Sequence, residues 1–313
     1  MAVPKTYSFA RYLAAKKSVD DRALNRRVLL TLTRALLKVP SGSPLRILEV
    51  GAGIGTMVER LLDWKVLKKA TYTAVDGDPQ IILEACRRLP RWATSCGYDL
   101  KAQYPEKMSL KKGDQNILVE LEAIEIADFS PRERDRRSWD LLIANALLDL
   151  VDVPSTLPLL FPLLPPGGLF YFTINFDGDT TFQPEIDPML DTHIMALYHE
   201  TMNHRVISGK PSGDSCTGRH LFAAIRACGA ELLDAGSSDW VVFAGSNGYP
   251  EDEAYFLHHI IHMISNALRG HPALDAKRFD AWIAERHNQV EKGTLIYITH
   301  QMDVLGRVPG NTA

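Results

Sequence analysis

The chain has 313 residues, of which 46% are hydrophobic and 23% charged, which is typical of a globular protein and excludes a disordered or fibrous one. Its formal net charge of -3 gives no electrostatic reason to expect a nucleic-acid partner. The four cysteines form no C-x-x-C pair, which favours reduced thiols over disulfides or a zinc site. The amino-terminal stretch has no apolar signal core, and prolines and glycines interrupt the longest apolar region, so we expect a cytoplasmic location and no membrane partner.

Helical and strand patterns alternate along the first half of the chain. Residues 7–38 have a helical pattern with a broad apolar face. Five apolar strands are then predicted at 46–50, 70–75, within 118–129, at 139–144 and at 169–175, with helices at 56–67, 79–92 and 155–164 between them. This alternation predicts an α/β fold with a doubly wound, mostly parallel sheet, which binds ligands at the carboxyl ends of its strands.

The second half of the chain adds helices to this pattern. We expect an insertion at 177–220 with one helix near 187–205, a helix at 219–228, a sixth strand at 240–243, two helices within 247–292 and a final strand at 294–299. The prediction is therefore one domain, 1–313, with seven strands and helical insertions after strand 5 and between strands 6 and 7. The insertions 177–220 and 247–292 are interpreted as a cap that binds substrate or as a dimerisation surface.

The most informative segment is Ile47–Thr56, an apolar strand that leads into a glycine turn and a helix. Gly51, Gly53 and Gly55 have the spacing G-x-G-x-G, whereas a dinucleotide fingerprint is G-x-G-x-x-G. Glu49 precedes the first glycine by two residues. Its carboxylate would oppose a pyrophosphate but attract an ammonium group, which disfavours a nicotinamide-dependent oxidoreductase.

This segment resembles motif I of the class I (Rossmann-fold) methyltransferases that use S-adenosyl-L-methionine (SAM), and the chain is most similar to their small-molecule type. The resemblance implies that SAM is the cofactor and S-adenosyl-L-homocysteine the product. It also implies that Asp76 binds the ribose hydroxyls, that Asp128 and Phe129 contact adenine, and that Asn145 lies near the methionine half. The expected cofactor-binding residues are Glu49, Gly51, Ala52, Gly53, Gly55, Asp76, Gly77, Asp128, Phe129, Asn145, Tyr12 and Arg11.

The amino-terminal segment 1–40 is a candidate lid. In related enzymes a segment before the first strand often folds over SAM, so either Tyr12 or Arg11 would cover the cofactor or contact its carboxylate. A helix that simply packs on the sheet is the alternative interpretation.

Catalytic candidates lie on the helix predicted near 187–205, which should overhang the strand ends. His199 and Tyr198 rank first and His204 follows, because histidine is suited to proton removal near neutral pH. Each is also typical of a packed or surface helix residue. His258 and His262 are one helical turn apart, but no H-E-x-x-H motif is present, so we expect no metal site.

The predicted function is methyl transfer from SAM to an O, N, S or C atom of a small molecule. Asn145-Ala146-Leu147-Leu148 departs from the Asn-Pro-Pro-Tyr pattern of enzymes that methylate bases or protein glutamines, which argues against those substrates. Two alternatives stay open: aminocarboxypropyl transfer or cyclisation of SAM on the same fold, and a non-catalytic SAM-binding or interaction protein. The apolar helix pair in 247–292 also makes a homodimer an open interpretation.

Overall fold

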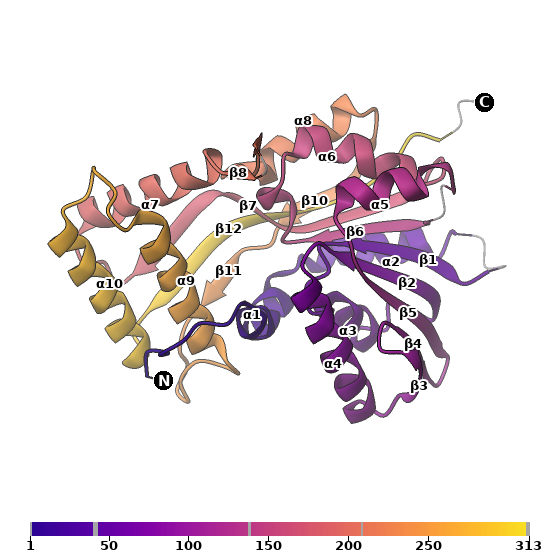
Figure 1. Ribbon diagram of the computed structural model, residues 1–313, viewed down its shortest axis with the longest axis horizontal. Helices are drawn as coiled ribbons and strands as arrows, with labels where there is room; N and C mark the ends of the chain where they lie inside the picture. The colour runs from indigo at the N-terminus through magenta and orange to yellow at the C-terminus, as the bar shows by residue number, and fades with distance from the viewer. Residues whose placement is uncertain (1, 40–42, 137–138, 208, 311–313) are drawn as a thin grey trace.

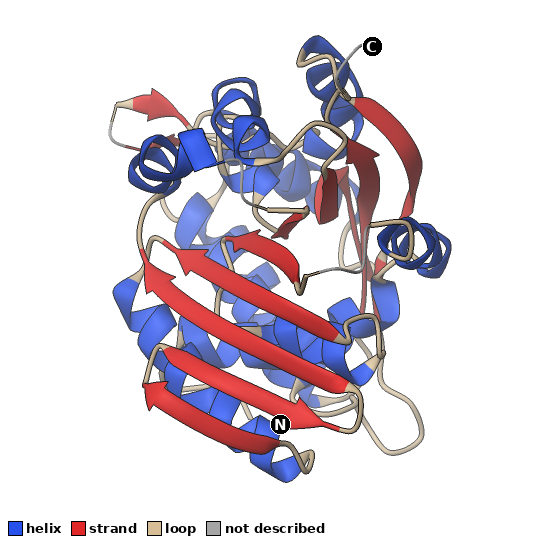
Figure 2. Ribbon diagram, turned by 90° about the vertical axis from the view of Figure 1, so that its right-hand side faces the viewer, coloured by secondary structure: helices blue, strands red, loops and turns tan. Residues whose placement is uncertain are grey.

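In the computed structural model, which describes residues 2–39, 43–136, 139–207 and 209–310, one large twisted sheet runs through the whole molecule (Figures 1 and 2). Ten described strands form it. Their order is β10 (Glu231–Ser237), β12 (Ile296–Arg307), β7 (Leu169–Gln183), β6 (Leu141–Asn145), β1 (Leu45–Val50), β2 (Lys69–Asp76), β5 (Gln115–Ala123), β4 (Lys107–Lys112) and β3 (Asp99–Tyr104), and β11 (Trp240–Val242) also pairs with β12.

The centre of the sheet is parallel, as the alternating pattern predicts. Strands β5, β2, β1, β6 and β7 run in the same direction, whereas β12 is antiparallel to both of its neighbours, β7 and β10. The α/β class is therefore confirmed. The sheet has ten strands where the sequence predicts seven, because the polar segment 97–116 folds into the hairpin β3–β4 and because β10 was not recognised.

Helices cover both faces of the parallel sheet (Figure 1). On one face, α2 (Arg26–Leu36), α3 (Thr56–Asp63) and α4 (Pro79–Ser95) share a core with Ile47 of β1. On the other, α5 (Ile126–Glu133), α6 (Val153–Leu160) and α8 (Thr217–Ala227) share a core with Leu48 and Val50. Because helices cover both faces of the sheet, strand β1 carries apolar side chains on both sides. A continuous apolar run of this kind is the sequence signature of a buried parallel strand.

Local sequence signals explain several of the helix boundaries. Asp78 caps α4, where its side chain accepts a hydrogen bond from Gln80 N (2.8 Å), and Pro79 is the first helical residue, as predicted. The single helical pattern of 7–38 is two helices, α1 (Phe9–Ala23) and α2. Asn25 separates them because its side chain caps α2 by accepting from Arg27 N and Val28 N (3.1 Å each).

A second lobe, called the cap here, extends from the carboxyl side of the sheet. It contains α1, α7 (Pro188–Asn203), α9 (Glu253–Leu268), α10 (Ala276–Glu291), β11 and the outer halves of β7 and β12, which share one apolar cluster. Strand β7 has 15 residues, so the segment after residue 177, predicted as the start of an insertion, first continues this strand. In Figure 1 the long strands β7 and β12 pass from the parallel sheet into the cap, and α1 lies between the two lobes.

The apolar helix pair that suggested a dimer surface is largely buried within the chain. Phe256, Ile260 and Ile264 of α9 and Trp282 of α10 are at most 4% exposed. They pack against α1, α7 and the outer strands, so the apolar pattern has an intramolecular explanation. The homodimer stays a prediction. Within the described part of the chain, every helix is too short or too polar to cross a bilayer.

Candidate functional site

The glycine loop, residues 51–55, lies at the point where the chain reverses its direction across the sheet. From β1 the chain passes to β2 and β5 on one side, and it then returns to β6 on the other side of β1. A switch of this kind leaves a crevice between the carboxyl ends of the two central strands, which is where open α/β sheets bind ligands. The loop after β1 and the turn after β6 form the two walls of this crevice.

Positive φ angles and close neighbours explain the three glycines of the loop. Gly51, Gly53 and Gly55 have φ angles of 64°, 55° and 82°, a region that side chains rarely adopt. A Cβ at Gly51 would lie 2.7 Å from Leu147 Cδ1, and one at Gly55 would lie 2.8 Å from Leu89 Cδ1. Gly51 therefore permits contact with the turn after β6, whereas Gly55 permits packing of α3 on α4.

Asp76, at the end of β2, is tied directly to the glycine loop. Its Oδ2 accepts a hydrogen bond from Gly53 N (2.9 Å), and its Oδ1 accepts one from Asp78 N (3.0 Å). Each carboxylate oxygen has a second lone pair, so the group retains the capacity to accept bonds from two ribose hydroxyls. The loop and the acid, 23 residues apart, thus form one preformed unit at the edge of the sheet.

The acid beside Asp76 is Glu125, which the sequence analysis missed. A Cβ at Gly77 would overlap the Glu125 carboxylate, so this carboxylate lies directly against Gly77. Glu125 directly precedes α5, just as Asp76 ends β2. Glu125 was missed because the third strand was predicted within 118–129, whereas the corresponding strand β5 ends at Ala123.

Asp128 and Phe129 lie in α5 and not in the loop after the third strand. Asp128 is exposed in the first turn of the helix. Phe129 is 1% exposed and packs on Trp139, with their ring centroids 5.5 Å apart. Phe129 is thus a core residue, so the structure does not present its ring as a wall for adenine. Asn145 ends β6, as expected, and its Oδ1 accepts a hydrogen bond from Thr173 (2.9 Å).

Glu49 is buried beneath the loop. It is 1% exposed, and its Oε2 accepts a hydrogen bond from the Tyr72 hydroxyl (2.8 Å). Burial raises the pKa of Glu49 to about 8, although the Tyr72 hydrogen bond and the charge of Arg60 oppose this rise. A cation beside Glu49 would favour its ionised form, so binding of an ammonium group there is coupled to proton release.

Helix α1 lies against the glycine loop. A Cβ at Gly53 would be 3.4 Å from Leu13 Cδ1, so this helix approaches the loop, and its role as a lid stays a prediction. Tyr12 is 8% exposed and stacks on His259 (4.5 Å between centroids). Arg11 instead points to the cap, where it forms a two-bond ion pair with Asp252 (2.8 and 2.9 Å).

The structure separates the three catalytic candidates on α7. His199 Nε2 is 3.1 Å from the Thr180 hydroxyl, and burial lowers the pKa of His199. Thr180 pairs with Thr299, whereas Phe172, beside the end of β6, pairs with Val304. This five-residue step along β12, about 17 Å, separates Thr180 from the residues beside the end of β6. The His199 ring also packs on Phe176, with 5.1 Å between centroids, so His199 lies along outer β7, and its catalytic role stays a prediction.

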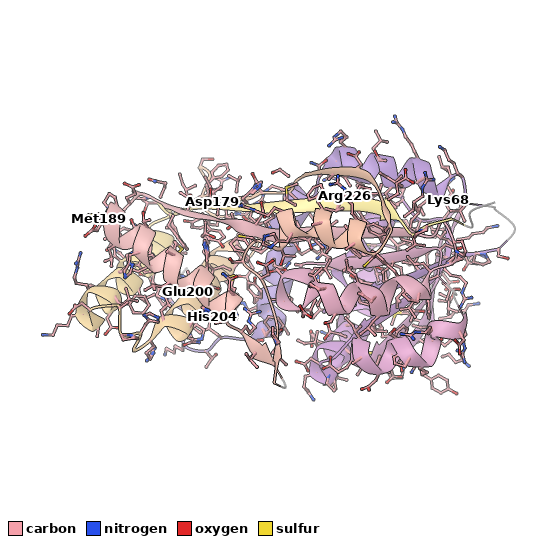
Figure 3. The ribbon with its side chains drawn as sticks, turned by 90° about the horizontal axis from the view of Figure 1, so that it is seen from above. Lys68, Asp179, Met189, Glu200, His204 and Arg226 are labelled. Carbon is pink, nitrogen blue, oxygen red and sulfur yellow. The ribbon has the colours of Figure 1, made fainter. Side chains whose placement is uncertain are left out.

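Tyr198 and His204 differ from His199 in their surroundings. Burial raises the pKa of Tyr198 to about 12, the charge of Asp149 adds to this rise, and that of Arg205 opposes it. Tyr198 thus faces the turn after β6. His204 is an exposed residue just after α7, and in Figure 3 it lies at the inner end of this helix, with Met189 at the outer end.

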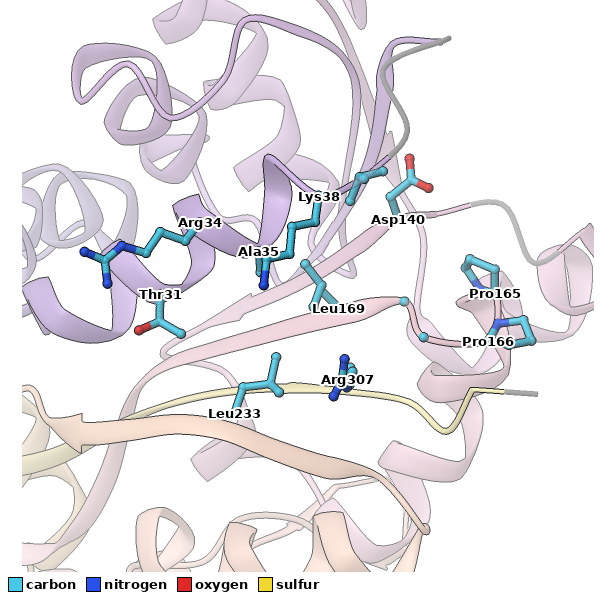
Figure 4. Close-up of a pocket in the computed structure, with 13 residues that line it drawn as sticks. Thr31, Arg34, Ala35, Lys38, Asp140, Pro165, Pro166, Leu169, Leu233 and Arg307 are labelled. Carbon is cyan, nitrogen blue, oxygen red and sulfur yellow. The ribbon is translucent and has the colours of Figure 1, made fainter. Parts of the chain in front are cut away.

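The glycine loop lines neither of two hollows in the described part of the structure. One of about 360 Å³ lies between outer β7 and α7 and is lined by His199 and Asp191. The other, of about 640 Å³, lies at the opposite end of the sheet, next to the Pro165–Gly168 turn that precedes β7 (Figure 4). Because Asp140 and Leu169 mark the amino ends of their strands there, this larger hollow is remote from the crevice.

The histidines of α9 pack with aromatic rings. His262 stacks on Tyr7 with 3.8 Å between ring centroids, and His258 Nδ1 is 2.8 Å from His287 Nδ1. Among the described residues, no group of three or more His, Cys, Asp or Glu side chains is arranged to hold a metal ion.

Comparison with known proteins finds similarity only among solved structures. No family model matches the chain, and no curated protein matches it. Phosphoethanolamine N-methyltransferase 2 from Haemonchus contortus, solved with SAM, aligns at a TM-score of 0.43 and 11% identity, over 98% of this chain and 61% of that one. Geranyl diphosphate C-methyltransferase from Streptomyces coelicolor A3(2), solved with S-adenosyl-L-homocysteine, aligns at 0.40 and 11%, over 90% and 81%.

Both of these proteins are methyltransferases, the class that the sequence predicts. Alignments at this identity and TM-score do not decide what this chain does. The residues of the crevice therefore carry the functional assignment.

Proposed function

We propose that this protein is a class I methyltransferase that transfers the methyl group of SAM to a small molecule. The observation that carries the proposal is the bond between Gly53 N and Asp76 Oδ2, which joins the glycine loop to an acid at the carboxyl edge of the neighbouring strand. This unit lies at the topological switch point, where the fold predicts a ligand.

The residues of the crevice fit the chemical groups of SAM. Asp76 has acceptor capacity for ribose hydroxyls, and Glu125, across from Gly77, is an acceptor for an amino group on the adenine ring. Glu49 is a buried acid that a cationic ligand would ionise, in accord with the ammonium group of SAM. A pyrophosphate would meet three acids here, Glu49, Asp76 and Glu125, which disfavours a dinucleotide.

The cap supports a small acceptor. Helices α1, α7, α9 and α10 form one packed unit with outer β7 and β12, and α1 contacts the glycine loop. SAM would supply an electrophilic methyl group, and the task of the protein is to align the acceptor atom with it and exclude water, which contributes about 7–11 kcal/mol when the geometry is right. A lobe that covers the crevice serves both purposes for a molecule small enough to be enclosed.

Binding of S-adenosyl-L-homocysteine, measured by calorimetry, tests the site directly. Asp76→Asn should weaken binding by about ten- to a hundredfold, because it removes a charged acceptor of two hydrogen bonds. The matched control is Asp78→Asn, two residues away, which alters the cap of α4 but leaves the affinity unchanged. Failure of the wild-type protein to bind, or an equal loss in both variants, would contradict the proposal.

Product analysis then separates methyl transfer from the other uses of SAM. Incubation with SAM and fractionated small metabolites should produce S-adenosyl-L-homocysteine and an acceptor heavier by one methylene unit. Methylthioadenosine in its place would identify aminocarboxypropyl transfer or cyclisation. SAM binding with no turnover in any fraction would favour the non-catalytic alternative.

A further inference from the structure

Asp149, on the opposite wall of the crevice from the glycine loop, has an unexplained carboxyl group. It lies in the short helix η2 (Leu148–Leu150), in the turn that follows β6. Its Oδ1 is buried and accepts no hydrogen bond from any described residue. A buried acceptor without a partner costs about 1–3 kcal/mol, so it needs a reason to be retained.

The position of this turn places Asp149 next to the reacting end of the proposed SAM site. Leu147, two residues earlier, is in contact with the position of Gly51. From the other side, Lys16 and Tyr12 of α1 interact electrostatically with Asp149, and the same helix contacts Gly53 through Leu13. Asp149 thus lies where the loop, the turn after β6 and the lid helix converge.

The backbone of this turn is held firmly. The Leu150 carbonyl accepts a hydrogen bond from the Ser212 hydroxyl (2.5 Å), and the Asp149 carbonyl accepts one from Asp214 N (3.4 Å). A Cβ at Gly213 would lie 3.0 Å from the same Asp149 carbonyl, so the segment after α7 packs closely on the turn. The side chain of Asp149 is therefore presented from a rigid support, as a catalytic group requires.

We propose that Asp149 is a catalytic residue whose carboxylate faces the methyl group in transit and accepts the proton of the acceptor. The acceptor atom X of an X–H group attacks the methyl carbon. The bond between this carbon and sulfur then breaks, and sulfur retains the electron pair and becomes a neutral thioether. The X–H proton passes to Asp149, so charge and atoms balance. This role rests on the proposed function and replaces His199 as the candidate base.

Charged and titratable groups reach Asp149 from each surrounding element. Burial raises its pKa to about 6; a hydrogen bond from its own backbone N–H and the charges of Lys16 and Arg205 oppose this rise, and the charge of Asp214 adds to it. The neighbours are Lys16 and Tyr12 from α1, Tyr198 from α7, and Arg205 and Asp214 from the following segment. Behind Asp214 lies His220 of α8, whose Nδ1 is 2.6 Å from Asp214 Oδ2. A carboxyl with this pKa is ionised at neutral pH yet basic enough to accept a proton.

The test compares two ligands that differ only at the reacting centre. S-adenosyl-L-homocysteine has a thioether there, whereas sinefungin has a carbon that carries an ammonium group at the place of the methyl. Asp149→Asn should weaken sinefungin binding about tenfold or more and change S-adenosyl-L-homocysteine binding less than about threefold. Asp152→Asn, in the same segment with no capping hydrogen bond, is the matched control and should change neither.

A measurement on the wild-type protein keeps the test independent of how the variant folds. The ratio of sinefungin to S-adenosyl-L-homocysteine affinity should rise as the pH increases through about 6 and then level off. Titration of Glu49 affects both affinities equally, because both ligands carry the same α-ammonium group, so its effect cancels in the ratio. In Asp149→Asn the ratio should not change with pH. A flat wild-type ratio, or equal losses of both ligands in the variant, would overturn the role of Asp149. Absence of binding of either ligand to the wild type would instead refute the proposed function.

Discussion

The parallel sheet and the cap are built by different means. In the sheet, strand and helix follow each other in short repeating units, and α4, for example, packs on β2, β3 and β5, which lie close to it in sequence. In the cap, α1 packs on α9, more than 200 residues later in the chain, and α7 packs on the same helix. Buried or half-buried ion pairs join its elements: Arg22 with Glu253 (2.5 and 2.8 Å) and Arg286 with Asp191 (2.6 Å).

This difference shows how the protein combines a standard ligand edge with a specific enclosure. The glycine loop and Asp76 depend on local geometry, which one strand–turn–helix unit can supply. The enclosure depends on charged groups that are costly to bury unless their partners are in place, so it forms only when distant segments meet. The predictions below test whether the two regions are energetically distinct and where they are coupled.

The largest expected loss of stability follows a substitution at the junction between the parallel sheet and the cap. Arg60 of α3 is fully buried and donates to Asp20 (3.2 Å) and to Asp21, both in α1. Arg60→Met should lower the free energy of unfolding by about 3 kcal/mol, because it removes the buried guanidinium that Asp20 and Asp21 share and leaves the buried Asp20 with Lys16 as its charged partner. Urea denaturation measures this change. Lys68→Met, at the exposed pair with Asp114, is the control and should have no measurable effect.

A substitution in the glycine loop should affect binding far more than folding. Gly53→Val should weaken S-adenosyl-L-homocysteine binding by about a hundredfold or more, because the side chain would press on Leu13 and displace the loop from Asp76. The control is Gly113→Val, at the similar φ of 58° but with no atom within 4 Å. Both variants should lose about 1–2 kcal/mol of stability from backbone strain; a binding loss in Gly113→Val as well would show that strain alone explains the effect.

The pH dependence of stability should reveal the buried acid under the loop. The pKa of Glu49 is raised to about 8 in the folded protein, so the folded state holds a proton that the unfolded state releases between about pH 4.5 and 8. The stability that Glu49 contributes is present at low pH and is lost as the pH rises through this window. Glu49→Gln should therefore gain stability relative to the wild type between pH 5 and 8; parallel curves would contradict the raised pKa.

The smallest effect is expected at Arg11. Arg11→Ala should cost at most about 1 kcal/mol, because its pair with Asp252 is partly exposed, and S-adenosyl-L-homocysteine affinity should stay within about threefold. Arg22→Ala should destabilise more, since Glu253 is completely buried. A clear loss of S-adenosyl-L-homocysteine affinity in Arg11→Ala would instead support the contact between Arg11 and the cofactor that the family resemblance implies.

Predictions succeeded where the signal was local. The strand before the glycine loop, the cap of α4 by Asp78 and the position of Asp76 follow from short-range patterns that one segment supplies. The hairpin β3–β4 was missed because its apolar alternation is short, with only Met108 and Leu110 buried in β4. The strand β10 was missed because its mostly half-buried residues show no alternation of burial. Phe129 was misjudged for a related reason: an aromatic residue after a strand has the same sequence signature whether it lines a pocket or fills a core.

By itself the sequence determined the α/β class, the glycine loop, the acid at the end of the second strand and, by resemblance, the SAM hypothesis. These depend on backbone conformation and on spacing within one unit, which local residues encode. Only the tertiary structure decided that His199 packs on Thr180 and Phe176 of outer β7 and that Arg11 pairs with Asp252. It also decided that the Glu125 carboxylate lies against Gly77 and that Asp149 Oδ1 is buried. Those outcomes depend on which distant segments pack together, and in this chain that packing combines one apolar cluster with buried charges whose partners lie up to about 230 residues apart.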